Sequence, residues 1–209
     1  MSIATPRRLF AASLAAALLS ISGWAFADKL PPGTVAIVDT PGPGGPFGTN
    51  GFDVFKDQRV AARFTVPADG DMRFVRTGLW MMNNSGDLRG NFLVSLQTDA
   101  VDEGGPATLP SGVDIEHWKV RVQTYGWSPV EQFFVSRTGP TLKAGHNYWI
   151  VVASNSPPFI DPVWTFARKG LGWSTTTFGG AWQQAGESGA LTLHVDAVPV
   201  TATAPTARN

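Results

Sequence analysis

The chain has 209 residues, with 16 basic and 16 acidic side chains and no cysteine. This length is enough for a single domain with a full hydrophobic core, so stability does not require disulfides. The lack of cysteine excludes thiol nucleophiles, iron–sulfur clusters and thiolate zinc sites. Because the chain carries no basic surplus, we expect no nucleic-acid partner.

The first 27 residues have the pattern of a cleavable signal peptide. Arg7 and Arg8 precede an apolar run at 9–21, and the small-x-small pattern that signal peptidase needs stands at 25–27. The run is too short for a comfortable membrane span. We therefore expect an exported protein, periplasmic or extracellular, with a mature chain that begins at Asp28. The arginine pair leaves open whether export follows the general or the twin-arginine route.

Residues 28–51 form a first segment that is repeatedly broken by proline and glycine. The strands expected in chain order lie at 35–38, 60–66, 74–82, 91–99, 117–122, 130–135, 148–153, 163–167, 173–178 and 191–197. Four of them alternate apolar and polar residues, which predicts one buried and one solvent-exposed face: 60–66, 91–99, 117–122 and 191–197. Three are apolar on both faces and are predicted to be central strands covered on each side: 74–82, 130–135 and 148–153.

The expected fold class is all-β, because no stretch of ten residues shows a helical period and turn signals separate the strands. Without helical crossovers the strands should pair antiparallel. We therefore predict a two-sheet antiparallel β-sandwich or jelly roll over 52–198, after the signal peptide at 1–27 and the segment at 28–51. The tail at 199–209 is expected to be disordered. After cleavage we expect no transmembrane segment.

The order of these landmarks resembles the choice-of-anchor R domain family of exported bacterial proteins. The matching elements are the strand at 58–66, the strand at 92–98 followed by Asp99, the Leu-x-Ala-Gly-x-x-Tyr-Trp element at 142–149, Trp164 and the closing strand at 191–198. The resemblance covers about 52–198 and implies a secreted or surface-displayed β-sandwich without an established activity or catalytic residues. The chain departs from the family by ending without a recognisable anchor, so we expect a free periplasmic or released protein.

No catalytic motif stands out. The nearest approach to a nucleophile elbow, at 186–189, lacks the final glycine, and no metalloprotease spacing occurs. The three histidines are His117, His146 and His194, and they are far apart in sequence. His117 and His194 are predicted on the wet faces of strands, as solvated side chains. We therefore predict no catalytic residues.

A calcium site is the one cofactor hypothesis. Asp99, Asp102 and Glu103 lie beside Gly104 and Gly105, and a hard cation prefers such carboxylate oxygens. The alternative is a solvated acidic hairpin loop, which the absence of EF-hand spacing favours. The sequence implies no other cofactor.

Three tryptophans suggest a ligand platform. Trp127, Trp173 and Trp182 stand in glycine-rich, turn-like surroundings, whereas Trp118 and Trp149 fit a core. Flat indoles stack on sugar rings, and Gln183 and Gln184 would bond the hydroxyls. The alternative is that the three indoles plug the open ends of the sandwich.

These observations predict an exported, non-catalytic protein with a structural, adhesive or surface-interaction role. The alternative is a carbohydrate-binding module that uses the three tryptophans, and the third hypothesis is a secreted hydrolase. The expected partners are glycans or other cell-surface components. The sequence does not indicate an oligomeric state.

Overall fold

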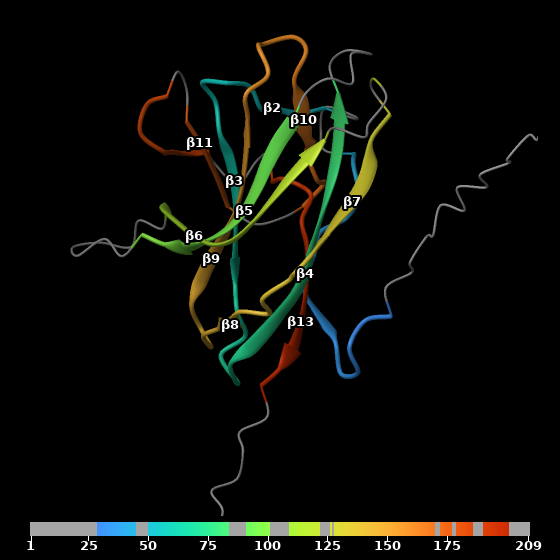
Figure 1. Cartoon of the computed structure of the whole chain (residues 1–209), viewed down its shortest axis with the longest axis vertical. Helices are drawn as coiled ribbons and strands as arrows, with labels where there is room; N and C mark the ends of the chain where they lie inside the picture. The colour runs from blue at the N-terminus through green and yellow to red at the C-terminus, as the bar shows by residue number, and fades with distance from the viewer. Residues whose placement is uncertain are drawn as a thin grey trace, which may run out of the picture.

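The computed structural model describes residues 29–44, 50–83, 91–100, 109–121, 126, 128–169, 172–176, 179–185 and 190–200. Its thirteen strands form two sheets, and every strand pairing is antiparallel. The sheets pack face to face as a sandwich (Figure 1). The predicted fold class is therefore confirmed. The signal-peptide prediction at 1–27 and the part of the predicted tail at 201–209 lie outside the described residues. The first two residues of the tail predicted at 199–209 are ordered, because Pro199 ends β13 and Val200 N–H donates to Asp71 C=O.

The larger sheet has seven strands: β1 (Val35–Asp39), β2 (Gly51–Asp53), β4 (Met72–Asn83), β7 (Val130–Val135), β8 (Thr141–Leu142), β10 (Pro162–Thr165) and β13 (His194–Pro199). Its main path runs β1-β13-β4-β10-β2, and β7 and β8 also pair with β4. Both β7 and β13 pair with β4 over 76–78, so they flank it on opposite sides. Among the described strands β7 has no second neighbour and forms an edge.

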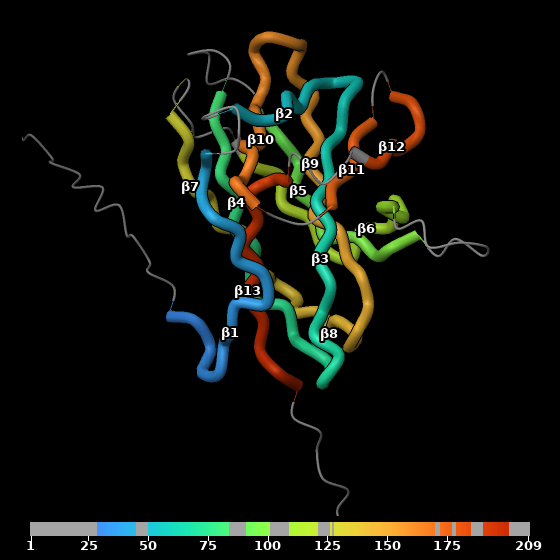
Figure 2. Tube along the Cα trace, turned by 180° about the vertical axis from the view of Figure 1, so that it is seen from behind, coloured from blue at the N-terminus to red at the C-terminus, as the bar shows by residue number. Residues whose placement is uncertain are grey.

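The smaller sheet has six strands: β3 (Val60–Thr65), β5 (Asn91–Asp99), β6 (Pro110–Arg121), β9 (Asn147–Ser154), β11 (Trp173–Thr175) and β12 (Gln183–Ala185). Their order is β12-β11-β3-β9-β5-β6, which makes β6 the edge nearest to β7. Figure 2 shows the sandwich from behind, with β1 beside β13 in one layer and β3 in the other.

The core between the sheets follows the period-two pattern of the sequence. Along β3 and the residue after it, Val60, Ala62, Phe64 and Val66 are all buried, as predicted. Aromatic pairs join the two layers, including Phe92 against Phe134 with ring centroids 6.1 Å apart. Burial of this apolar surface is the main source of stability in a chain without disulfides.

Three features of the fold correct the sequence prediction. The segment at 28–51 is not separate from the domain, because β1 pairs with β13 and β2 pairs with β10. Strands β2, β8 and β12 were missed because each has only two or three residues. The predicted wet face of β13 is largely covered: Asp196 is 4% exposed and forms an ion pair with Arg76.

The prediction for β7 was also wrong. Apolar residues occur on both of its faces, as in a central strand, but Glu131 and Gln132 interrupt them, and β7 is an edge strand. Val130, Phe133 and Val135 are 43%, 41% and 40% exposed. Apolar residues on both faces indicate that both faces are covered, but they do not indicate which molecule supplies the cover.

Candidate functional site

The ring of Phe133 on β7 lies on the outer face of the seven-stranded sheet. It covers a position of the neighbouring strand β4 that has no side chain, because the residue there is glycine. Its partner in the β4 register is Gly78, where an added Cβ would stand 2.7 Å from Phe133 Cε1. Glycine at this position therefore lets the ring lie against the strand. Arg76 places its guanidinium carbon 4.1 Å from the Phe133 ring centroid, and the His194 ring meets Phe133 edge-on at 5.7 Å.

A charged network supports this aromatic group. Arg76 Nε donates to Asp196 Oδ2 at 2.5 Å, which fixes the guanidinium beside Phe133. His194 lies between two carboxylates, with Nδ1 3.2 Å from Asp39 and Nε2 2.9 Å from Asp196. The contact with Asp196 is a close approach without hydrogen-bond geometry. These contacts fix Arg76 and the His194 ring beside Phe133, so the network orients the aromatic ring.

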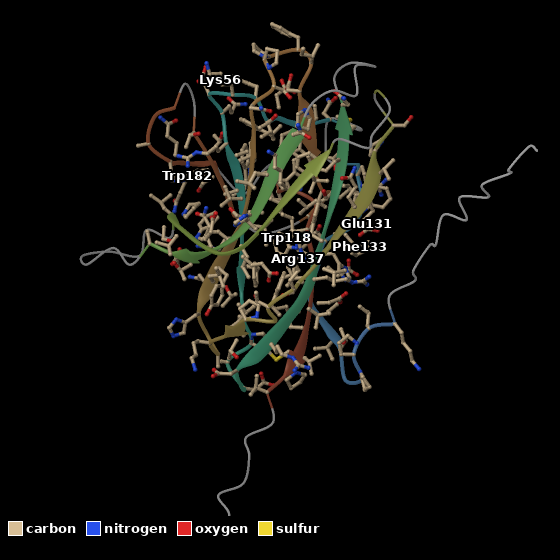
Figure 3. All side chains as sticks on the ribbon, in the orientation of Figure 1. Lys56, Trp118, Glu131, Phe133, Arg137 and Trp182 are labelled. Carbon is tan, nitrogen blue, oxygen red and sulfur yellow. The ribbon has the colours of Figure 1, made fainter. Side chains whose placement is uncertain are left out.

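Glu131 is the charged side chain that β7 itself contributes to this face. Burial raises the pKa of its carboxyl, and the charge of Asp39 adds to that effect, while the positive charges of His194 and Arg76 oppose it. Glu131 faces Trp80 in the β4 register. We call Glu131, Phe133 and Val135, together with Arg76 and His194, the β7 surface. Figure 3 shows Glu131 and Phe133 next to each other on β7, far from Trp182.

A groove of about 490 Å³ runs between the edge strands β6 and β7. Its lining is partly apolar, with Val120 and Phe134 on the two sides, and it carries the cations Lys119 and Arg137. Glu116 joins β6 to the turn after β7, where its carboxylate accepts hydrogen bonds from Ser136 Oγ, Arg137 N–H and Thr138 Oγ1 at 2.5, 2.5 and 3.1 Å. The two sheets are therefore tied together beside the groove.

The backbone of β7 leaves polar groups directed away from β4. Ser136 N–H donates to Val75 C=O at 2.8 Å, which fixes the alternation of the strand. The N–H and C=O groups of every second residue face β4, so those of Glu131 and Phe133 face the opposite way. No described strand pairs with them. This edge is a template for a further antiparallel strand.

One end of that edge is already occupied. The indole Nε1–H of Trp118 donates to Val135 C=O at 2.8 Å, which confirms that this carbonyl points away from β4. The contact leaves the part of β7 from Val130 to Phe133 as the open edge. Trp118 itself is 6% exposed, as its predicted core role requires.

The predicted tryptophan platform is not assembled as a unit. Trp173 is only 7% exposed and packs edge-on against Phe52 at 4.8 Å, so it plugs the core and is not a platform. Trp127 lies outside the described residues. Trp182 is half-buried on the cluster of Ala61, Trp149 and Val151.

Arg59 covers part of the remaining indole, with its guanidinium carbon 5.0 Å from the Trp182 ring. Gln183 and Gln184 are exposed beside Trp182. Of the five residues predicted to bind a glycan, the structure therefore brings together these three on the outer face of the six-stranded sheet. Their arrangement offers one partly covered indole and two amides, which is a smaller surface than the three-tryptophan platform.

The calcium hypothesis finds little support in the one described residue of its triad. Asp99 Oδ1 accepts a hydrogen bond from Trp149 Nε1 at 2.7 Å, so this carboxylate has a structural partner. Asp102 and Glu103 lie outside the described residues. Across the described ranges, no three histidine, aspartate or glutamate side chains converge in a way that would hold a metal ion.

The closest approach to a hydrolytic triad is at His117. This residue faces Ser95 across the β5–β6 register, and its Nδ1 lies 3.9 Å from Asp114. Ser95 is 3% exposed, and its Oγ accepts a hydrogen bond from Gln97 at 3.1 Å. Among the contacts of the described residues none links Ser95 Oγ to His117, so the bond between nucleophile and base is missing.

The other two histidines do not assemble such a site. His146 is exposed and lines a hollow of about 510 Å³ with Asp99 and Tyr148. His194 was predicted as a solvated side chain, but it is 18% exposed and held between Asp39 and Asp196. Sequence reasoning therefore missed its role in supporting Phe133. The one sequence signal near Phe133 was Pro129, directly before β7, because proline in a sheet is confined to edge strands, strand starts and bulges.

No protein-family model matches the chain, and no curated protein matches it. The resemblance to the choice-of-anchor R domain family therefore stays a prediction. The described residues contain no helix that is long and apolar enough to cross a membrane.

Proposed function

We propose that this chain is an exported, non-catalytic structural protein that acts by surface contact, with the β7 surface as its contact site. The observation that carries the proposal is the edge strand β7, which exposes three apolar side chains by 40–43% beside unpaired backbone groups. Most large apolar side chains among the described residues are buried, so a concentration of exposed ones on one open edge needs a reason. Covering this edge with another strand would satisfy both the side chains and the backbone.

The proposed occupant of the edge is β7 of a second copy. Antiparallel pairing about a two-fold axis at Gln132 places Glu131 of each copy opposite Phe133 of the other, and the outward backbone groups of these residues then bond to each other. Because Arg76 lies 4.1 Å from the Phe133 ring, each Glu131 carboxylate approaches Arg76 of the second copy. The surface is therefore complementary to itself in both charge and hydrogen bonding.

Sedimentation velocity of the purified protein tests the pairing. The contact is limited to one strand edge, so we expect a reversible dimer with a dissociation constant on the order of 10 μM. Phe133→Ser should weaken the dimer at least about tenfold because it removes the central aromatic group. Glu131→Lys should weaken it as well, by placing two cations together. Val113→Ser is the matched control, since Val113 is 62% exposed on β6.

A protein that stays monomeric at all concentrations would overturn the pairing. Dimerisation that persists unchanged in Phe133→Ser would place the contact elsewhere and would also contradict the proposal. Export has its own test: the protein recovered from the periplasm or medium should begin at Asp28 when its N-terminus is sequenced. Retention of the uncut chain in the cytoplasm would rule out the exported role.

A carbohydrate-binding role is the second candidate function. Exposed Gln183 and Gln184 beside the half-buried Trp182 support it, because the uncovered part of an indole contacts the apolar face of a sugar while amides bond its hydroxyls. A glycan array with the folded protein, repeated with Trp182→Ala and Phe133→Ser, tests this role. Binding that falls with Trp182→Ala alone supports it, and a blank array rejects it.

A further inference from the structure

The loop between β9 and β10 carries the most exposed large apolar side chain among the described residues. Phe159 is 83% exposed and the next residue, Ile160, is 39% exposed. Figures 1 and 2 both show this orange loop extending past the strands at one end of the sandwich. The loop lies apart from β7 and from Trp182.

Phe159 also has an unfavourable backbone conformation. Its φ is +73°, and it is the only described residue other than glycine with a positive φ. Bulky side chains rarely adopt this region, which glycine or asparagine enters easily. The free protein therefore bears both a strained backbone and a hydrated aromatic ring at the same residue. Strain of this kind concentrates at functional sites, which makes the displayed ring a candidate for binding.

The base of the loop is firmly held. Ser156 is buried and its carbonyl accepts a hydrogen bond from Lys56 N–H at 2.8 Å, while Val54 N–H donates to Pro162 C=O at 2.9 Å. Asp161, directly after the tip, is fully buried. The consecutive prolines at 157 and 158 restrict the ascending side of the loop. The aromatic ring is thus presented on a stiff support.

We propose that this tip inserts into the apolar layer of a lipid bilayer. Four successive exposed residues of the tip, at 157–160, carry no charge, whereas the exposed Lys56 is held at the base through its own N–H. Figure 3 shows Lys56 at this same end of the molecule. Asp57, next to Lys56, is exposed as well, so the base carries charges of both signs. An uncharged apolar tip above a charged base matches the order of layers in a membrane, where polar headgroups lie above the acyl chains.

The shape of the tip favours a lipid over a protein partner. A protein surface would need a preformed pocket to receive a protruding ring, whereas a bilayer accepts a convex apolar tip without one. Two inserted side chains give only a weak, reversible attachment, as a single short anchor does. This inference goes beyond the proposed contact through β7 and uses none of its residues.

Co-sedimentation with phosphatidylcholine vesicles tests the insertion. We expect the wild-type protein to partition onto the vesicles and Phe159→Ser to lower the partition coefficient about tenfold or more, as expected for one buried aromatic side chain. Adding phosphatidylglycerol should change binding little, because the exposed carboxylate of Asp57 lies beside Lys56. All proteins are compared in the same processed form, so any contribution of residues 1–27 cancels.

Phe159→Gly separates a binding role from a structural one. Glycine accepts the positive φ, so the variant should keep or raise the thermal midpoint while losing vesicle binding as fully as Phe159→Ser. Phe159→Trp should retain binding. Val113→Ser is the matched control, because it removes another exposed apolar side chain on β6 and should leave binding intact.

Three results would overturn the inference. The first is wild-type partition no greater than that of Phe159→Ser. The second is an equal loss of binding in Val113→Ser. The third is a wild-type protein that ignores vesicles but forms an oligomer that Phe159→Ser dissolves, which would assign the tip to a protein contact. Phe133→Ser should not alter vesicle binding, so failure of this inference and failure of the β7 pairing remain distinguishable.

Discussion

The outer faces of the two sheets differ in how they meet solvent. On the six-stranded sheet Trp149 is 1% exposed. It forms a cluster with Ala61 and Val151, and the half-buried Trp182 packs over this cluster. Its indole N–H donates to Asp99, and neighbouring Gln97 donates to Asp114 at 2.9 Å. This face has built a second, smaller core from the chain's own residues.

The seven-stranded sheet at β7 has no such cover. Phe133 is 41% exposed although Arg76 and His194 hold it in place. An ion pair with Asp196 fixes Arg76 beside the ring, and Gly78 leaves room for the ring against β4. The ring is therefore oriented but not buried. The comparison teaches that a sheet face covered by its own chain stabilises the fold, whereas an oriented but uncovered edge is available for contact.

The first variant tests whether the outer face of the six-stranded sheet is a core around Trp149. Trp149→Ala should lower the free energy of unfolding by about 3–5 kcal/mol, because it removes a buried indole and leaves the Asp99 carboxylate without its donor. Phe133→Ala should cost less than about 1 kcal/mol, since the ring is already largely hydrated. Urea unfolding of both variants measures the difference.

Trp149→Phe serves as the control for the hydrogen bond, because it keeps most of the apolar volume. It should lose clearly less stability than the alanine variant. Equal costs for Trp149→Ala and Phe133→Ala would break the comparison, since the two faces would then contribute alike.

The next effect concerns the link that joins the two sheets beside the groove. Glu116 is 7% exposed and accepts three hydrogen bonds from the turn after β7. Glu116→Ala leaves those donors unpaired and should cost about 3 kcal/mol. Thr138→Val removes a single donor, at 3.1 Å, and should cost about 1 kcal/mol. Similar losses in the two variants in chemical unfolding would show that the carboxylate does not act as a shared acceptor.

A pair of proline variants sharpens the assignment of β7 as an edge. Gln132 N–H faces β4, so Gln132→Pro removes a sheet hydrogen bond and should cost about 2 kcal/mol. Glu131→Pro affects an N–H that faces away from β4 and should cost little stability while abolishing the dimer. Thermal melts and sedimentation velocity on both variants give the two readouts. A reversed order of stability would show that the alternation along β7 is the opposite.

Much of the fold follows from the sequence because burial imposes a period of two on a strand with one covered face. The residues at 60–66 alternate clearly, and β3 buries Val60, Ala62 and Phe64 as predicted. Short strands such as β8 have too few residues to show a period. Their pairing depends on β4, which is distant in the chain.

The candidate site was harder to predict, because its parts come from separate strands. Phe133 depends on Gly78, Arg76 and His194, and only the sheet register brings them together. The residues at 130–135 predicted a strand covered on both faces, but a sequence does not say whether such cover belongs to the same chain. Trp173 shows the converse, since its glycine-rich surroundings suggested exposure while Phe52 and Phe166 enclose it.

The smallest expected effect is a pH dependence at Glu131. Burial raises the pKa of its carboxyl above the ordinary value of 4.5, so the folded monomer binds more protons than the unfolded chain just above that pH. Stability should therefore fall as the pH rises through the window between 4.5 and the folded value, by less than about 1 kcal/mol because solvent screens a half-exposed group. Glu131→Gln should remove this slope in urea unfolding of dilute monomer.

Asp71 gives an internal reference of opposite sign. Its pKa is lowered by hydrogen bonds from Lys143 Nζ and Ala144 N–H, so its contribution is present above 3.8 and is lost as the pH falls through the folded value. Asp71→Asn should remove only that acid limb. At concentrations where copies pair through β7, Arg76 of the second copy should oppose the burial effect on Glu131 and flatten its slope. A slope that stays the same in monomer and dimer would mean that Glu131 does not enter the contact, and the two faces would then differ in stability alone.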